Sequence, residues 1–225
     1  MNQRVVLASN NPGKLREFSA ILGAAGIEMV AQGTLGVTEA AEPYLTFVEN
    51  ALAKARHASQ ATGLPALADD SGLCVRGLGG APGVHSARYA VKTDGTRSDA
   101  DNNARLVSEL SGIADRRGSY VAVLVYVRSA DDPRPIVVEG VWDGEVLDTP
   151  RGDQGFGYDP YFFLPDLGKT AAELSLAQKN QVSHRARALQ GLLRSLRGLF
   201  DDGPGQRRPD QAGATPQGRS DQNTR

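Results

Sequence analysis

The hydrophobic pattern changes between two periods along the first part of the chain. Apolar runs at residues 4–8 and 27–31 have the length of buried strands. Between them, apolar side chains recur at helical spacing over residues 15–25, behind a natural N-cap at Asn11 and a proline, Pro12, at the first helical position. The pattern predicts a strand, a polar loop, a helix and a second strand.

Capping residues predict three more helical regions. Each region begins at a residue whose side-chain oxygen can accept a backbone N–H of the first turn, and apolar residues follow at helical spacing. The expected helices cover about 46–62, 98–110 and, interrupted by a second cap at Ser183, 175–199.

A long run of high β-propensity lies at residues 119–128, and a second run lies at 136–142. The Asp131-Asp132-Pro133 segment between them is a turn sequence, so the two runs are expected to form a hairpin. We therefore expect an α/β fold with an elongated mixed β-sheet flanked by helices, rather than a purely parallel sheet.

Composition separates the chain into two parts. Its 225 residues include 40% hydrophobic and 23% charged residues, which suits one globular domain over residues 1–200. Residues 201–225 are rich in charged residues, glycine, proline and glutamine, and their only hydrophobic residues are Ala212 and Ala214. This segment cannot bury a core, so we expect a disordered polar tail.

Charge and cysteine content exclude several classes of protein. The formal net charge of −1 gives no basic field for a nucleic acid, and no apolar run is long enough to span a membrane. The one cysteine, Cys74, cannot form an internal disulfide and is expected to be a small core residue. With no visible signal peptide, these features favour a cytoplasmic protein without nucleic-acid or membrane partners.

The apolar run at residues 66–68 ends at two adjacent carboxylates, Asp69 and Asp70, which Ser71 and Gly72 follow. This pattern is typical of a buried strand that ends at a site, as ligands gather beyond the carboxyl ends of strands in open α/β sheets. If both acids stay extended, their side chains point to opposite faces. An ordinary Asp-Ser-Gly turn explains the same residues, and the local sequence leaves both interpretations open.

The loop at residues 9–14 can bind an anion, because it connects a strand to a helix whose free amides point at the loop. Lys14 adds a positive charge there, although the spacing of a Walker loop is absent. A capped helix with a solvated lysine is the alternative. Two further basic residues, His184 and Arg185, lie near a predicted helix start with Lys179 before them, where cations oppose the helix dipole; they indicate an anionic partner or a basic solvated face.

Phe156 lies between Gly155 and Gly157, which frees the backbone and exposes an aromatic face that can stack on a nucleobase. A β-bulge around a core phenylalanine is the alternative. A triphosphate needs cations, a purine needs a stacking face, and carboxylates can hold magnesium. The residues together therefore indicate a metal-dependent nucleotide enzyme.

The sequence resembles the inosine triphosphate pyrophosphatase family, the house-cleaning XTP/dITP diphosphatases. The resemblance covers about residues 5–197, and its motifs are highly specific only in combination. They are LASNNPGK (7–14), TFVENALAKA (46–55), ADDSGL (68–73), LGGAPGVHSARYA (78–90), GFGYDP (155–160) and Lys179 followed by His184-Arg185. The resemblance implies two lobes around a nucleotide-binding cleft, a homodimer, and Mg²⁺-dependent hydrolysis of a deaminated purine nucleoside triphosphate to the monophosphate and pyrophosphate.

The resemblance also implies roles for residues at the matching positions. Asp70 is implied as the proton acceptor and as a metal ligand. The second metal carboxylate lies in the connection before the helix at 46–62, where Glu42 is our choice and Glu39 the rival. The implied substrate contacts are Ser9, Asn10, Asn11, Pro12, Gly13, Lys14, Ser71, Phe156, Gly157, Tyr158, Asp159, Lys179, His184 and Arg185.

The expected mechanism is attack of water on the α-phosphorus, with Asp70 accepting the proton. Mg²⁺ and the cations would offset charge on the leaving pyrophosphate. In the alternative mechanism the metal activates the water and Asp70 is only a ligand. A nucleotide-sensing module without turnover would not need the acidic pair, and RNA binding is disfavoured by the net charge.

Overall fold

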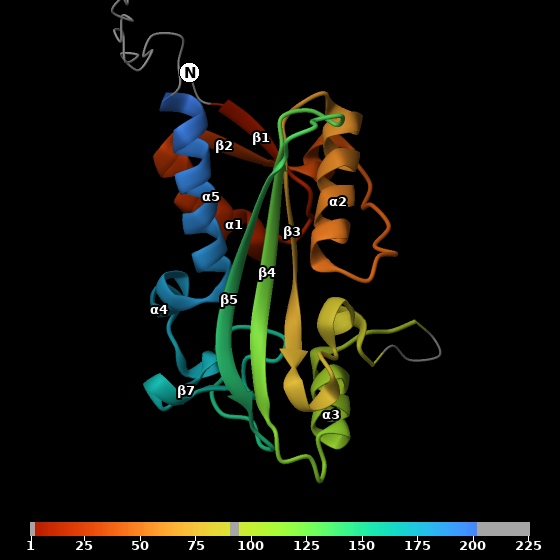
Figure 1. The fold of residues 1–225 in the computed structure, drawn as a ribbon, viewed down its shortest axis with the longest axis vertical. Coiled ribbons are helices and arrows are strands. Elements are labelled where there is room, and N and C mark those ends of the chain that lie inside the picture. Colours follow the sequence, from red (N-terminus) through yellow and green to blue (C-terminus); the bar gives the residue numbers. More distant parts are fainter. Residues whose placement is uncertain (1–2, 91–94, 202–225) are drawn as a thin grey trace, which may run out of the picture.

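The computed structural model describes residues 3–90 and 95–201, and the fold is a seven-stranded sheet with helices on both faces (Figure 1). The strands are β1 (Gln3–Leu7), β2 (Ile27–Ala31), β3 (Ala66–Val75), β4 (Arg117–Val127), β5 (Ile136–Val146), β6 (Phe162–Leu164) and β7 (Lys169–Thr170). The α-helices are α1 (Pro12–Leu22), α2 (Phe47–Thr62), α3 (Asp99–Glu109), α4 (Leu176–Val182) and α5 (His184–Asp201). None of these described helices is long and apolar enough to cross a membrane.

The strand order is β2-β1-β3-β4-β5-β6-β7. β1 runs parallel to β2 and β3, whereas β3, β4, β5, β6 and β7 form successive antiparallel pairs. The expected hairpin of β4 and β5 and the expected mixed sheet are both confirmed. The long strands β3, β4 and β5 extend through the molecule and connect its two ends (Figure 1).

Alternation along the strands builds a core on each face of the sheet. Val5 and Leu7 of β1 join the cluster under α1 and α5, whereas Val6 joins the cluster under α2. Ala51 and Ala55 of α2 are fully buried in that second cluster, and their small side chains let the helix pack close to the sheet. A third cluster fills the other end of the molecule, between α3 and the far halves of β3, β4 and β5.

The helix caps follow the sequence closely. The side chain of Asn11 accepts hydrogen bonds from the backbone N–H groups of Gly13 and Lys14, at 2.8 and 3.2 Å, and begins α1 as expected. Ser175 begins α4 with a complete capping box, and Ser183 ends α4 while its hydroxyl caps α5. The predicted second cap at Ser183 is therefore confirmed.

The third strand differs from its prediction. β3 does not end at the two acids but continues to Val75, and Asp69 and Asp70 pair with Leu124 and Val123 of β4. Both interpretations of this segment, a strand end and a turn, were wrong, because β4 is long enough to provide backbone partners for the whole segment. Gly72 has a packing reason, since a Cβ there would lie 2.3 Å from the carbonyl oxygen of Gly83.

Two smaller predictions also change. Cys74 is half-buried and not a core residue, because it alternates with the fully buried Leu73 and Val75 along β3. Lys179 lies in the last turn of α4 rather than near a helix start. Of the predicted disordered tail, Asp201 ends α5, and the rest lies outside the described residues.

Candidate active site

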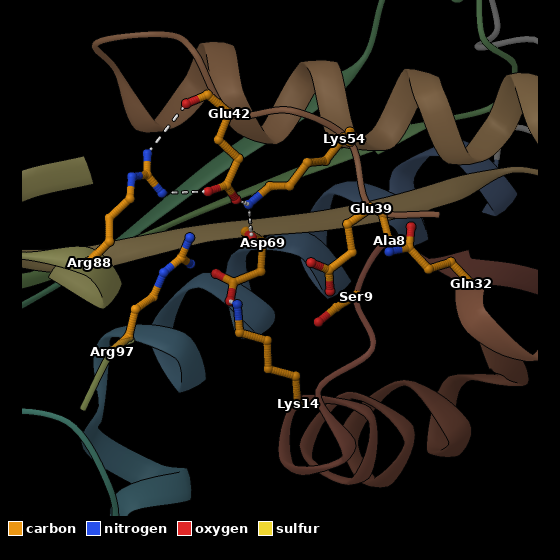
Figure 2. A pocket seen from close by; sticks show the side chains of 11 residues that line it. Ala8, Ser9, Lys14, Gln32, Glu39, Glu42, Lys54, Asp69, Arg88 and Arg97 are labelled. Carbon is orange, nitrogen blue, oxygen red and sulfur yellow. Dashed lines mark hydrogen bonds and ion pairs between the residues drawn. The ribbon is translucent and has the colours of Figure 1, made fainter. Parts of the chain in front are cut away.

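A polar cavity of about 450 Å³ opens beside the loop that connects β1 to α1 (Figure 2). Its walls carry cations and carboxylates from six separate parts of the chain. The lining residues are Ala8, Ser9, Lys14, Gln32, Glu39, Ala40, Glu42, Lys54, Asp69, Arg88 and Arg97. A cavity with this concentration of charge can hold a polyanion together with a cation.

Asp69 organises the cations on one side of this cavity. Its side chain is fully buried, with Oδ2 at 2.7 Å from Lys14 Nζ and 3.5 Å from Arg185 Nε. Burial alone would raise the pKa of Asp69, but Lys14 and Arg185 hold it well below its ordinary value. Asp69 is therefore a permanent anion that holds the two cations in place.

Asp70 points to the other face of β3, toward α2. Lys54 Nζ lies 2.8 Å from Asp70 Oδ1, 2.8 Å from Glu42 Oε1 and 2.9 Å from the backbone oxygen of Asp69. Arg88 Nη1 donates to Glu42 Oε2 at 2.9 Å, and Figure 2 shows Glu42 between Arg88 and Lys54. The prediction that the two adjacent acids face opposite sides of the sheet is confirmed.

Burial affects the two carboxylates of this cluster differently. It raises the pKa of Asp70, since the attraction of Lys54 does not fully offset desolvation and since Glu42 and Asp69 lie close. Burial would also raise the pKa of Glu42, but Lys54 and Arg88 together lower it. Lys54 has a raised pKa despite its own burial, because Asp70 and Glu42 surround its ammonium group. The pKa of Asp70 is thus shifted upward and that of Glu42 downward from their ordinary values.

A second pocket, of about 300 Å³, lies between the loop at 155–159 and the start of α5, and Lys14 lines both pockets. Phe156 is 55% exposed here. Lys179 Nζ lies 5.6 Å and Arg185 Cζ 6.0 Å from the centre of its ring. The expectation of an exposed aromatic face is confirmed, and the β-bulge alternative is wrong.

The loop that carries Phe156 is held from two sides. The Phe156 N–H donates to Asp159 Oδ2 at 2.9 Å, and Lys179 Nζ donates to the same oxygen at 2.6 Å. From α3, Asp99 accepts the N–H of Gly157 at 2.7 Å, and the Asn103 amide donates to the carbonyl of Gly157 at 2.9 Å. The aromatic ring is therefore placed by backbone hydrogen bonds rather than by burial.

His184 also lines this second pocket. Its ring stacks on Tyr120, with centroids 4.7 Å apart and planes 9° apart, and Trp142 lies beyond at 6.3 Å. Burial, with Arg185 and Lys179 near, lowers the pKa of His184 to about 3. Its Nδ1 is buried and has no hydrogen-bond partner among the described residues. His184 is therefore neutral at physiological pH and offers an unused polar atom.

The structure brings most of the predicted site residues together. Ser9, Lys14 and Glu42 line the first pocket, as does Glu39, whose Oε1 is 3.4 Å from the amide of Asn10. Pro12 and Gly13 form the first turn of α1 beside them. The second pocket is lined by Asn11, Lys14, Ser71, Phe156, Gly157, Tyr158, Asp159, Lys179, His184 and Arg185, among others.

Tyr158 lines the second pocket, but its hydroxyl already has a partner within the protein. It is buried, and its hydroxyl donates to the backbone oxygen of Ser86 at 2.8 Å. Sequence reasoning missed Lys54, although a lysine among the small residues on the buried face of α2 was a usable signal. It also missed Arg88, and Glu17, whose carboxylate lies 2.9 Å from Arg185 Nη1.

Comparison with known proteins gives a consistent result. The sequence model of the Ham1 family matches residues 5–195. The chain is 68% identical over 200 residues to a dITP/XTP pyrophosphatase of Ralstonia nicotianae, which covers 89% of this chain and 99% of the relative. It is 59% identical over 194 residues to a dITP/XTP pyrophosphatase of Neisseria meningitidis, with 86% and 96% covered.

Solved structures agree with the fold. A HAM1 protein from Coxiella burnetii is similar with a TM-score of 0.83 and 43% identity, over 87% of this chain and 99% of that protein. The Ham1 protein of Staphylococcus aureus is similar with a TM-score of 0.78 and 37% identity, over 88% and 100%. The α/β fold with an elongated mixed sheet is thus shared with these proteins.

Proposed function

The chain belongs to the Ham1 family, and on this premise we propose that it hydrolyses deaminated purine nucleoside triphosphates (ITP, dITP and XTP) to the monophosphate and pyrophosphate. One observation carries the proposal beyond the relatives' names. A polar cavity rich in cations and carboxylates and a pocket with an exposed aromatic ring share one residue, Lys14. A triphosphate fits the first pocket and a purine fits the second.

The phosphate-binding role rests on the start of α1 and on the cations around the first cavity. Backbone N–H groups at a helix start attract an anion, and Lys14 adds a full charge there. Because Asp69 holds both Lys14 and Arg185, it sets where positive charge meets the substrate. Lys54, Arg88 and Lys14 are the cations that we assign to the triphosphate.

Asp70 is our choice for the proton acceptor. It is buried, and burial raises its pKa, so its carboxylate is a stronger base than an exposed aspartate. It does not itself line the first cavity, but it contacts Lys54, which does. We assign to it the proton of the water that attacks the α-phosphorus.

The donor set of the cavity fits a magnesium ion. The described residues contain no group of three or more His, Cys, Asp or Glu side chains that could hold a metal alone. Mg²⁺ is commonly bound by one or two carboxylates together with substrate phosphates, and Asp70 and Glu42 both converge on Lys54 Nζ. We assign these two carboxylates to Mg²⁺, and Glu39 is the rival of Glu42. When bound, the ion would supply positive charge to the phosphate oxygens.

The base-binding role rests on Phe156 and the start of α5. The exposed ring can stack beneath a purine, and the neutral His184 and the charged Arg185 line the same pocket. Hypoxanthine and xanthine present a keto oxygen and a protonated N1, whereas adenine presents the reverse pattern. A site that hydrogen-bonds the keto edge can discriminate by about 10⁴, because adenine would leave buried groups unpaired.

Two further features complete the proposal. We propose a homodimer, which the family resemblance implies, and light scattering on the purified protein measures it directly. We also propose a cytoplasmic location, with no nucleic-acid or membrane partner, from the net charge of −1 and the one cysteine.

The test is pyrophosphate release from a panel of ITP, dITP, XTP, GTP and ATP with Mg²⁺. We expect the first three to be good substrates and GTP and ATP to be poor. Comparable kcat/KM values across the panel would refute the specificity, and release of single phosphates would refute the reaction. The Asp70→Asn variant is expected to fold and to bind ITP, but to lose turnover by several orders of magnitude. Near-normal turnover of this variant would remove Asp70 from its assigned role.

A further inference from the structure

Lys54 occupies an unusual position for a lysine. Its side chain is only 11% exposed, and its ammonium group lies within 2.9 Å of three oxygens, from Glu42, Asp70 and the backbone of Asp69. An ammonium group has three N–H donors, and each has an acceptor here. Lys54 therefore occupies the centre of the carboxylate pair in the way that a bound cation would.

We propose that Lys54 is the resident cation of this pair in the free protein, and that it excludes a divalent ion until a nucleotide binds. This inference rests on the proposed function, in which Glu42 and Asp70 hold Mg²⁺. It adds an order of events: the free protein has low affinity for Mg²⁺, and the metal enters together with the triphosphate. Lys54 acts here as a positioning residue, through the carboxylates that it holds.

Lys54 and a magnesium ion would compete, because both need the same carboxylate oxygens of Glu42 and Asp70. A magnesium ion on Glu42 and Asp70 would need the lone pairs that Lys54 now uses, and the ammonium charge would lie beside the metal charge. Mg²⁺ also releases its water molecules reluctantly, so it has little means to displace a bound ammonium group. The free protein therefore keeps the carboxylates neutralised without metal.

In this proposal, binding of the nucleotide allows the metal ion to replace Lys54 on the two carboxylates. Lys54 lines the same cavity as Lys14 and Arg88, where we assign the triphosphate. The ammonium group lies on a flexible four-carbon stem, so it can turn from the carboxylates to a phosphate oxygen without movement of α2. The phosphates then bring both the new partner for Lys54 and the remaining ligands for the metal.

A purely structural role for Lys54 makes a different prediction. If Lys54 only neutralises two buried acids, its removal destabilises the fold and does not improve metal binding. If Lys54 competes with the metal, its removal exposes the ligands and raises the affinity. Metal affinity of the free protein separates these two roles.

The experiment measures Mn²⁺ binding to the full chain without nucleotide, by electron paramagnetic resonance of the free ion, with Mg²⁺ as competitor. We expect Lys54→Met to bind Mn²⁺ at least tenfold more tightly than the unmodified protein. The matched control is Lys14→Met, which removes the same charge from the same cavity. Lys14 contacts the carboxylate of Asp69 and not the pair of Glu42 and Asp70. Its effect is expected to be threefold or less.

Unchanged or weaker binding by Lys54→Met, or an equal gain in Lys14→Met, would overturn the proposal. Thermal unfolding checks that each variant folds, and Lys54→Gln takes the place of Lys54→Met if the latter does not. Because no nucleotide is present, the result is independent of turnover. Failure of the proposed function would appear in the pyrophosphate assay, whereas failure of this inference would appear only in Mn²⁺ binding.

Discussion

The buried imidazole of His184 predicts a specific dependence of stability on pH. The ring is stacked on Tyr120 and 8% exposed, and its pKa is lowered to about 3, first by burial and then by the charge of Arg185. In the unfolded chain a histidine has a pKa near 6.5. Between these two values the unfolded chain binds a proton at His184 and the folded protein does not.

The sign and size follow from this difference. A lowered folded pKa means that the contribution of His184 to stability is fully present above pH 6.5 and is lost as the pH falls toward 3. From linkage with these two pKa values, the loss between pH 7.5 and pH 5.0 is about 2 kcal/mol. Any pKa of His184 below about 4 in the folded protein gives nearly the same loss, so the prediction does not depend on the exact value of that pKa.

The measurement is urea unfolding of the unmodified protein and of His184→Gln at half-unit intervals from pH 7.5 to 5.0. His184→Gln is expected to lower the free energy of unfolding at pH 7.5, because the stacking on Tyr120 is lost. Its free energy of unfolding is also expected to fall less steeply with decreasing pH, because the contribution of His184 is absent. Subtraction of the two curves removes the contribution of the carboxylates, which both proteins share. The matched control is His85→Gln, which removes an exposed histidine from the 3₁₀ helix Gly83–Arg88.

Parallel curves for the unmodified protein and His184→Gln would refute the reasoning. They would mean that His184 binds its proton as easily in the folded protein as in the unfolded chain. The same loss of slope in His85→Gln would assign the effect to another group.

Two further predictions concern residues that position others. Asp69→Asn is expected to lower the free energy of unfolding by about 3–5 kcal/mol, because it leaves the partly buried Lys14 and the buried Arg185 without their shared anion. Urea unfolding at pH 7.5 measures this change, and a change below about 1 kcal/mol would contradict the prediction. Asn103→Leu is expected to raise KM for ITP by about tenfold while kcat changes little, because the loop of Phe156 loses its hydrogen bond to the Asn103 amide whereas the phosphate site is untouched. Steady-state kinetics measures both constants, and a roughly tenfold fall of kcat at unchanged KM would contradict the prediction.

Local sequence signals predicted the elements of this fold well. Asn11 and Ser183 begin helices because their side chains satisfy free backbone donors within a few residues, so the signal and its cause are both local. The hairpin of β4 and β5 was equally clear from two runs around one turn. The end of β3 was not, because strand pairing depends on a partner about 50 residues away along the chain, and the Asp-Ser-Gly sequence by itself favours a turn.

Among the residues of the candidate site, too, those with a local sequence signal could be predicted and those that depend on distant partners could not. Phe156 could be identified from its glycine neighbours, and Lys14 from its place after a cap. Glu17 gave no such signal, and the signal at Lys54 pointed to a helix face but not to a role. The roles of both residues depend on which carboxylate or guanidinium contacts them. Periodicity places such residues on a helix face, but only the packing of that helix on the sheet decides what the face meets.

The continuation of β3 through the two acids has a consequence for the chemistry. Had the strand ended at Asp69, the two carboxylates would have lain in one flexible loop, free to compete for the same cations. Because both residues are held in the antiparallel ladder with β4, Asp69 faces Lys14 and Arg185 while Asp70 faces Lys54 and α2. Asp69 has a lowered pKa and holds the cations, whereas Asp70 has a raised pKa and is the residue to which we assign the proton of the attacking water. The alternation of side chains along a single strand thus separates two tasks that adjacent carboxylates could not otherwise divide.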